Sequence, residues 1–460
     1  MPIAAERPKI HLDRTLRTVE YFTLAFGTMV GVGWLVVIDD WLGRGGPFGA
    51  MIGFLSAGVL LMPIALVYAR LVAAFPDAAG EVAYAERVYG PVVVFATGWA
   101  MTLAYLVVCP WEAVAIGKLL ARLFPGLDSV ALYSFAGKTV YLHRLLVGLA
   151  LTALVCGINY RGIRFSSKFQ NVCTFVLLAV FAVFSALGLA RGDVRQLTPM
   201  FARPGVDGAL VSVLLVLQVV PYFMTGFESV AKSSEEASAD LDRRGFGRAI
   251  VLALVGGTVF YVTVLLVVPM LCPWRELTQT PFGTAVAFER AFGSRTIGDL
   301  IIFGAIVSLF KVFNGNFVAG TRMLYGMAGR SLVHPALGRV HERFLTPHVA
   351  IGFGLGFTVL GTLLGESVLI PISEVGSLAV AIGWLTACLS FLKGVGWPEG
   401  GRPARVDLAA AGAGAVVSLA LIVLKVAPFS PGHLGAPEYL ALGLWTTVGL
   451  GLWLSARVGR

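Results

Sequence analysis

The stretch 21-YFTLAFGTMVGVGWLVVIDDWL-42 decides the fold of this chain. It is apolar and long enough to cross a bilayer as a helix, which takes about 20 residues. Three glycines, Gly27, Gly31 and Gly33, nevertheless interrupt its middle. Each costs a helix about 1 kcal/mol relative to alanine, so the cluster predicts that the backbone leaves the helix there. N–H and C=O groups freed at membrane depth are tolerated where they line a cavity or meet a ligand. The alternative is an ordinary kink with close glycine packing.

A second interrupted segment reads 217-LQVVPYFMTGFESVAKSSEEA-237. Pro221 removes a backbone donor and Gly226 follows five residues later, so we expect a break between two half-helices. By our segmentation the two breaks fall in the first and the sixth membrane crossing. Corresponding breaks in two halves of opposite topology are typical of a carrier built from an inverted repeat.

The composition requires lipid as the outer solvent. Hydrophobic residues make up 57% of the chain, charged residues 13%, and the mean hydropathy is +0.83. A soluble domain carries roughly a quarter charged residues. The net charge of +9 is attributed to Lys and Arg in cytoplasmic loops and not to a nucleic-acid partner. The five cysteines show no metal-ligand or disulfide spacing and are expected to be small core residues.

The chain is therefore predicted to be an all-α integral membrane protein with about twelve crossings. The distribution of Lys and Arg places both termini in the cytoplasm. A short amphipathic helix on the outer face is expected within 272–296. The predicted crossings are 21–43, 47–74, 91–121, 139–158, 163–190, 209–235, 243–271, 297–327, 347–364, 368–392, 406–427 and 437–456.

Five motifs, in order, resemble those of the amino acid–polyamine–organocation superfamily of transporters, most closely its amino-acid permeases. They are GTMVGVG (27–33), FPDAAGEVAYAERVYGP (75–91), GIRFSSKFQN (162–171), GFESVAKSSEEAS (226–238) and TRMLYGMAGRSLVHP (321–335). The resemblance implies a single LeuT-like transporter domain over 1–460, with a 5+5 inverted repeat and discontinuous helices 1 and 6. Its expected parts are a cytoplasmic tail (1–19), repeat 1 (20–190), repeat 2 (205–365) and C-terminal helices (366–460).

The resemblance also implies where a substrate sits, namely between the two breaks. Its carboxylate would meet backbone N–H groups at the first break, and its ammonium would meet carbonyls at the second. The substrate-binding residues expected on this basis are Thr28, Met29, Val30, Gly31, Val32, Gly33, Tyr222, Phe223, Met224, Thr225 and Gly226.

Lys168 is the residue expected to carry the coupling proton. In some proton-coupled members of the superfamily, a lysine at the matching position replaces a sodium ion beside helices 1 and 8. A buried lysine can load and release a proton. The alternative is a lysine at the cytoplasmic mouth of helix 5, near Arg161 and Arg164.

Other polar and aromatic residues are candidates for the pocket or its gate: Lys311, Asn314, Trp34 and Glu112. Lys311 lies in the middle of a predicted crossing, where a charge is expensive and therefore indicates function. It could pair with Glu112, with Glu228 or with the Asp39–Asp40 pair, or contact an acidic group on the substrate. A purely structural ion pair is equally open. Asp39 and Asp40 are expected to line an external vestibule, and a filter for cationic substrates is the alternative.

The sequence thus predicts a secondary transporter of an amino acid or related small amine in the cell inner or plasma membrane, with a proton as coupling ion. An exchanger of an amino acid against an amine is the alternative. No catalytic residue, metal site or cofactor is expected, which makes a membrane enzyme less favoured. A channel is also less favoured, since no selectivity-filter repeat occurs. The substrate's identity and the oligomeric state are not predicted.

Overall fold

The computed structural model describes residues 15–398 and 401–458, so most of the predicted tail (1–14) lies outside the described residues. Within these ranges, ten helical segments are long and apolar enough to cross a membrane. Two shorter apolar helices, α9 (Gly205–Leu217) and α16 (His348–Thr362), stand where the sixth and ninth crossings were predicted. The all-α membrane fold predicted from the sequence is confirmed.

The long helices coincide closely with the predicted crossings. The first crossing comprises α1 (Thr18–Met29) and α2 (Gly33–Val36), and the third comprises α5 (Pro91–Leu106) and α6 (Val108–Leu123). The sixth comprises α9, α10 (Val220–Met224) and α11 (Ser229–Lys232). The others are α3 (Ile38–Ala74), α7 (Leu142–Tyr160), α8 (Ile163–Arg191), α12 (Arg244–Leu271), α15 (Arg295–Gly329), α17 (Leu369–Leu392), α18 (Arg405–Val426) and α19 (Ala436–Val458).

Short elements join these helices. The predicted amphipathic helix within 272–296 is present as α14 (Gly283–Phe292). The remaining ones are α4 (Glu81–Ala85), α13 (Trp274–Leu277), and the 3-10 turns η1 (Pro125–Asp128), η2 (Val194–Leu197), η3 (Ser234–Glu236), η4 (Pro335–Gly338) and η5 (Gly365–Val368).

The α3 helix joins the outer half of the first crossing to the second crossing. Gly46 has φ +67°, a conformation that suits glycine, and Pro47 follows it. The helix is therefore kinked at this point and continues beyond it. A Cβ on Gly46 would lie 2.7 Å from the backbone N of Ala202. The predicted boundary between 43 and 47 is therefore confirmed.

One element was not predicted. An antiparallel hairpin, β1 (Ala131–Phe135) and β2 (Lys138–Tyr141), precedes α7. The predicted start of the fourth crossing at 139 was wrong, since the helix begins at Leu142. Ala136 and Gly137 both have positive φ, which allows the tight turn that reverses the chain. Tyr, Phe and Val flank this turn and favour strands.

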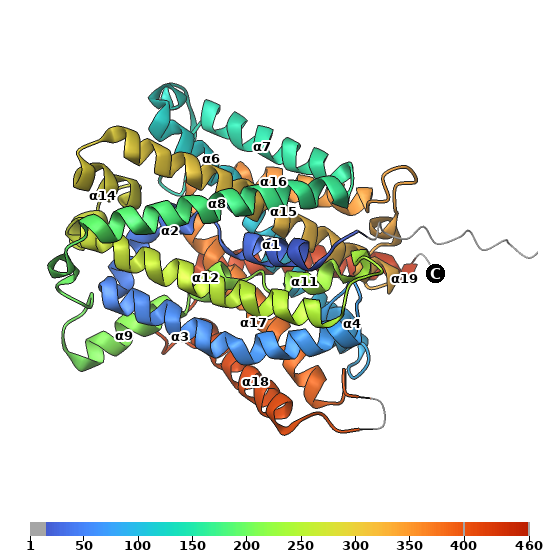
Figure 1. Cartoon of the computed structure of the whole chain (residues 1–460). Coiled ribbons are helices and arrows are strands. Elements are labelled where there is room, and N and C mark those ends of the chain that lie inside the picture. Colours follow the sequence, from blue (N-terminus) through green and yellow to red (C-terminus); the bar gives the residue numbers. More distant parts are fainter. Residues whose placement is uncertain (1–14, 399–400, 459–460) are drawn as a thin grey trace, which may run out of the picture.

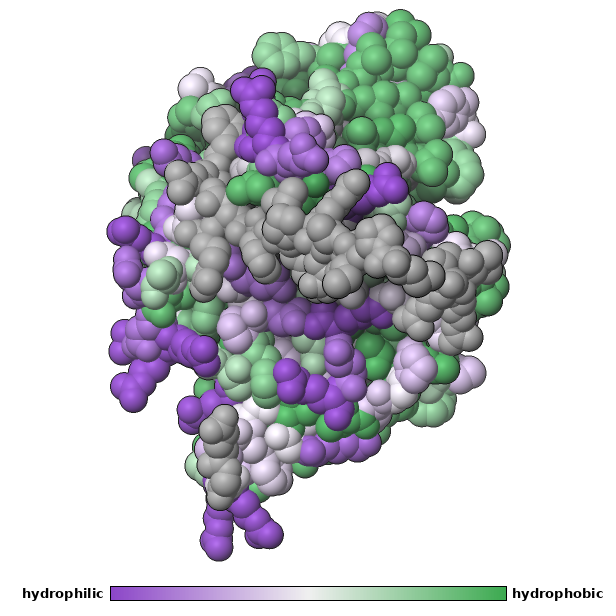
Figure 2. Space-filling model, turned by 90° about the vertical axis from the view of Figure 1, so that its right-hand side faces the viewer, coloured by the Kyte–Doolittle hydropathy of each residue, from purple (hydrophilic) through white to green (hydrophobic). Residues whose placement is uncertain are grey.

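The helices form one bundle with two distinct ends (Figure 1). The described chain begins at α1 and ends at α19 on the right of the picture, which we call the terminal face. The α9 and α14 helices lie at the other end, which we call the opposite face. Figure 2 views the terminal face, where hydrophilic residues gather at the centre and left, while hydrophobic residues cover the upper right flank.

Buried ion pairs close the bundle at the terminal face. Lys232 of α11 pairs with Glu81 of α4, and both side chains are fully buried. Arg322 of α15 pairs with Glu236 of η3 at 2.9 Å, again with both side chains buried. Removing one partner of such a pair would leave a buried charge without compensation, so these contacts hold the surrounding helices in one arrangement.

Glycines allow close helix contacts, and α7 offers a matched pair to test this. A Cβ on Gly148 would lie 2.4 Å from the backbone O of Ala113 in α6, whereas a Cβ on Gly157 would meet nothing within 4 Å. We expect Gly148→Ala to lower the thermal midpoint of the purified protein, since overpacking costs roughly 1–3 kcal/mol. Gly157→Ala, the control, should be neutral or slightly stabilising. Equal midpoints for the two variants would contradict this packing.

Candidate functional site

The first break lies between α1 and α2 at the centre of the bundle (Figure 1). Residues 30–32 are not helical and are fully buried. The N–H groups of Gly31, Val32 and Gly33 therefore make no hydrogen bond of either helical ladder. The predicted departure of the backbone from the helix is confirmed.

Lys311 of α15 binds backbone carbonyls at this break. Its ammonium donates to the carbonyl of Gly27 at 3.2 Å and to that of Val30, and its side chain is fully buried. The same ammonium lies 5.8 Å from the centre of the Phe26 ring, within reach of a cation–π contact. None of the expected ion pairs of Lys311 with an acidic residue occurs within 4 Å among residues 15–398 and 401–458.

Neutral side chains satisfy the other freed carbonyls of the first break. Two of them come from α15 and one from α12. The bonds are Asn316 Nδ2 to Thr28 O (3.2 Å), Tyr261 Oη to Met29 O (3.1 Å), and Ser308 Oγ to Val30 O (3.1 Å) and to Gly31 O (3.2 Å).

The second break separates α10 from α11. Gly226 has φ +139°, and its N–H donates to both carboxylate oxygens of Glu228, at 3.2 and 3.1 Å. The hydroxyl of Tyr105 donates to the same carboxylate at 3.0 Å. These contacts give Glu228 a structural role at the start of α11. A second interruption at 218–219 precedes Pro221, which lies in the first turn of α10, where its missing N–H costs little.

The two breaks touch each other. A Cβ on Gly226 would lie 2.6 Å from the backbone N of Met29 and 2.9 Å from the carbonyl carbon of Thr28. Only a glycine therefore permits this approach, both for the space and for the backbone conformation.

A small cavity of about 20 Å³ lies beside this contact. Seven of the residues singled out from the sequence line it: Thr28, Met29, Gly31, Gly33, Glu112, Tyr222 and Phe223. The sequence reasoning missed four more: Val108, Trp111, Val312 and Asn316. Two of these are neighbours of selected residues, because Trp111 precedes Glu112 and Val312 follows Lys311. The break residues Val30, Val32, Met224, Thr225 and Gly226 are buried next to the cavity without lining it.

The other four selected residues, Lys311, Trp34, Asn314 and Lys168, do not line the cavity. The Trp34 ring packs edge-on against Phe184 and Phe260, on the other side of the break. The side chain of Asn314 is held by three polar residues of α7 and α8. These are Asn159 (3.0 Å), Ser166 (3.0 Å) and Gln170 (3.1 Å).

Lys168 of α8 has an exposed side chain. The described contacts of α8 with the first crossing come instead from residues such as Gln170 and Thr174, whose side chains donate to the carbonyl of Thr23. The lysine that reaches the broken backbone is Lys311.

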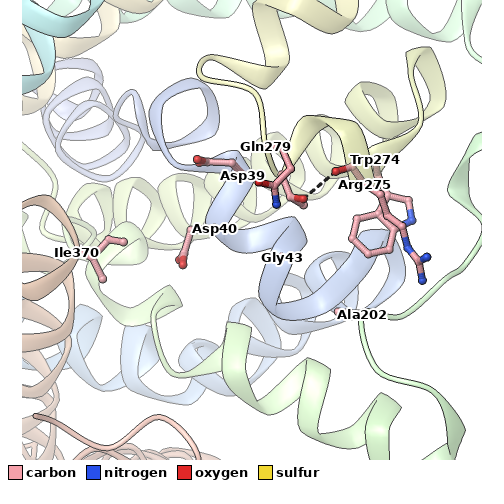
Figure 3. Close-up of a pocket in the computed structure, with 9 residues that line it drawn as sticks. Asp39, Asp40, Gly43, Ala202, Trp274, Arg275, Gln279 and Ile370 are labelled. Carbon is pink, nitrogen blue, oxygen red and sulfur yellow. Dashed lines mark hydrogen bonds between the residues drawn. The ribbon is translucent and has the colours of Figure 1, made fainter.

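A wide pocket opens at the opposite face, with a volume of about 650 Å³ (Figure 3). Asp39, Asp40 and Gly43 of α3 line one side of it, and Trp274, Arg275 and Gln279 come from the segment after α12. The expected vestibule at Asp39 and Asp40 is thus an open pocket in the structure. Its remaining lining residues are Ala202, Thr278 and Ile370.

An ion-pair network joins three helices beside this pocket. Arg44 of α3 pairs with Asp40 at 2.7 Å and with Glu374 of α17 at 3.1 Å. Lys425 of α18 also pairs with Glu374. The network connects the helix that follows the first break to two helices of the C-terminal region.

Comparison with known proteins gives a consistent result. The amino acid permease family model matches residues 16–449. The chain is 25% identical over 392 residues to the amino-acid permease RocE of Bacillus subtilis (strain 168), covering 82% of this chain and 80% of the relative. The methylthioribose transporter of the same organism is 27% identical over 379 residues, with 78% of each chain covered. Its branched-chain amino acid permease BcaP is 25% identical over 394 residues, with 84% and 81% covered.

The discontinuous first and sixth crossings, the enclosed cavity between them and the family match over nearly the whole chain agree. The family and these relatives are transporters and not enzymes. The chain belongs to the amino acid permease family of multi-pass membrane transporters.

Proposed function

We propose that this protein carries an amino acid or a related small amine across the cell membrane by alternating access. The observation that supports this most is the enclosed cavity beside two touching backbone breaks. The N–H groups of Gly31 to Gly33 are outside the helical ladders and suit a carboxylate. The carbonyls of Tyr222 to Thr225 would meet the ammonium. The relatives' names, which include amino acids and methylthioribose, agree with a small polar substrate.

In this proposal the terminal face is cytoplasmic and the two repeats, 20–190 and 205–365, have opposite topology. The buried ion pairs Lys232–Glu81 and Arg322–Glu236 close the cytoplasmic path in the structure. The pocket at Asp39 and Asp40 is the external entrance. Rocking of the two broken helices, with the helices after them, would open one end while it closes the other.

The contact between the breaks gives a direct test of the transport site. Gly226→Ala would force a Cβ to within 2.6 Å of the Met29 backbone N. Overpacking of this kind costs roughly 1–3 kcal/mol, so we expect amino acid uptake into proteoliposomes to fall about tenfold or more.

The matched control is Gly205→Ala. Gly205 also has positive φ, at +76°, but a Cβ there would meet nothing within 4 Å. Uptake by this variant should stay close to that of the wild type. Equal uptake by Gly226→Ala and Gly205→Ala would show that contact between the breaks is not needed for transport.

We further propose that transport is coupled to protons and that Lys311 carries the coupling proton. Its ammonium joins α15 to the carbonyls of Gly27 and Val30 at the end of α1. A neutral amine would hold these carbonyls less firmly, because hydrogen bonds from a charged donor are roughly twice as strong. Loss of the proton would therefore loosen the first broken helix from α15. Lys168, the candidate chosen from the sequence, has an exposed side chain and serves as the comparison.

Two substitutions at Lys311 distinguish the need for a proton that can dissociate from the need for a positive charge. Lys311→Met removes both, and Lys311→Arg keeps a charge that does not dissociate in proteins. In proteoliposomes with an internal pH indicator, we expect both variants to lose substrate-driven proton entry about tenfold or more. Counterflow exchange of labelled substrate should persist in Lys311→Arg, since exchange needs no net proton movement.

Lys168→Met is the control and should retain both activities. Normal proton entry with both Lys311 variants would contradict the proposal, and its loss in Lys168→Met would return the role to Lys168. Counterflow without proton entry in the wild type would instead favour an exchanger.

A further inference from the structure

The cavity holds three polar oxygens that have no hydrogen-bond partner among the described residues. They are Glu112 Oε2, Asn316 Oδ1 and the hydroxyl of Tyr222. The three residues are 2%, 1% and 6% exposed, so water does not reach these atoms freely. A buried polar atom without a partner is costly, and three around one cavity indicate a ligand that donates hydrogen bonds.

The orientation of the Asn316 amide is fixed by its own contacts. Its Nδ2 donates to the carbonyls of Thr28 and Val312, at 3.2 and 2.9 Å. The remaining atom, Oδ1, can only accept. Asn316 thus presents an acceptor to the cavity, as the carboxylate of Glu112 does when ionised.

Glu112 lies directly against the first break. Its Oε1 would be 3.0 Å from a Cβ on Gly31. No Lys, Arg or His in the described ranges pairs with it within 4 Å, since Lys311 gives its ammonium to the carbonyls of Gly27 and Val30. A buried carboxylate without an ion-pair partner favours a cation as its neighbour in the cavity.

The walls of the cavity also suit a cation. Trp111, Tyr222 and Phe223 line it, and the Tyr222 ring lies 6.4 Å from that of Trp111 and 5.0 Å from that of Phe223. The indole N–H of Trp111 already donates to the carbonyl of Leu369 at 2.9 Å, so this residue has no further donor to offer. Aromatic faces attract ammonium and guanidinium groups.

The pocket at the proposed entrance carries charges of both signs. Asp39 and Asp40 follow the first break and line the pocket at the opposite face, where Arg275 is the one basic residue among the lining residues. Since Arg44 pairs with Asp40 at 2.7 Å, these charges nearly balance, and the selection of charge falls to the cavity.

We propose that the cavity selects a substrate with a net positive charge, whose ammonium or guanidinium group donates to Glu112 Oε2, Asn316 Oδ1 and the Tyr222 hydroxyl. The substrate class is then a basic amino acid or its decarboxylated amine, rather than a zwitterion with an apolar side chain. This inference rests on the proposed transport function and narrows it.

The experiment compares two sets of competitors for uptake into proteoliposomes of the whole protein. Lysine, arginine and their decarboxylated amines form the cationic set, and leucine, alanine and methionine form the neutral set. We expect the wild type to bind the best cation about tenfold or more tighter than any neutral compound. Glu112→Gln should weaken cation binding about tenfold or more and change neutral binding less than about threefold.

Two further variants make the result specific. Tyr222→Phe removes a hydroxyl that has no partner in the described protein, so the fold should be unaffected, and cation binding should weaken several-fold. Glu276→Gln removes a carboxylate that is paired with Arg290 and lines neither pocket, so it should leave the cation preference unchanged.

A wild type that prefers neutral amino acids would overturn the inference while leaving the proposed function intact. So would an unchanged ratio of cation to neutral binding in both Glu112→Gln and Tyr222→Phe. If neither set of compounds is taken up, the result would instead contradict the proposed transport function itself.

Discussion

The whole site depends on how the protein satisfies the backbone that the first crossing exposes. Five carbonyls, of residues 27 to 31, accept hydrogen bonds from Lys311, Asn316, Ser308 and Tyr261. The N–H groups of Gly31 to Gly33 have left both helical ladders, and Gly31 and Gly33 line the cavity. At this break the protein itself supplies the donors to the carbonyls, and the N–H groups of Gly31 and Gly33 remain for a ligand in the proposed mechanism.

In this arrangement α15 supplies most of the side-chain donors to the broken backbone. Three of the four donating side chains come from one stretch of α15, between Ser308 and Asn316. Lys311 is the charged member of the set, so the strength of the contact between α1 and α15 varies with its protonation in the proposed mechanism. The neutral donors would keep the break satisfied in either state, which suits a helix that must move without unfolding.

The sequence was sufficient for the crossings and for both breaks, because each depends on local chemistry. Runs of apolar residues mark the helices, and Gly31, Gly33 and Gly226 mark the places where the backbone departs from them. The sequence was insufficient where the prediction depended on which way a side chain points. Position along the chain gives the depth of Lys168 or Trp34 and not the side of the helix from which it projects, so the sequence could not show that the Lys168 side chain is exposed while that of Lys311 is buried at the first break. Asn316 was missed for the same reason. The hairpin before α7 was missed because its apolar residues fit a helix as well as a strand.

Opposite charges on the two sides of one break link the proposed substrate site to the proposed proton site. Glu112 lies against Gly31 and Lys311 binds the carbonyls of Gly27 and Val30, so the two side chains approach the same short stretch of backbone although they form no direct pair. A cationic substrate bound to Glu112 would neutralise the counter-charge of Lys311 and so weaken the hold of the buried ammonium on its proton. By reciprocity, the proton on Lys311 would weaken substrate binding by the same factor. In the proton-coupled entry proposed above, this repulsion would act at release, where each cation helps to expel the other into the cytoplasm. Such a linkage needs no conformational relay, since the two groups approach the same few residues of broken backbone.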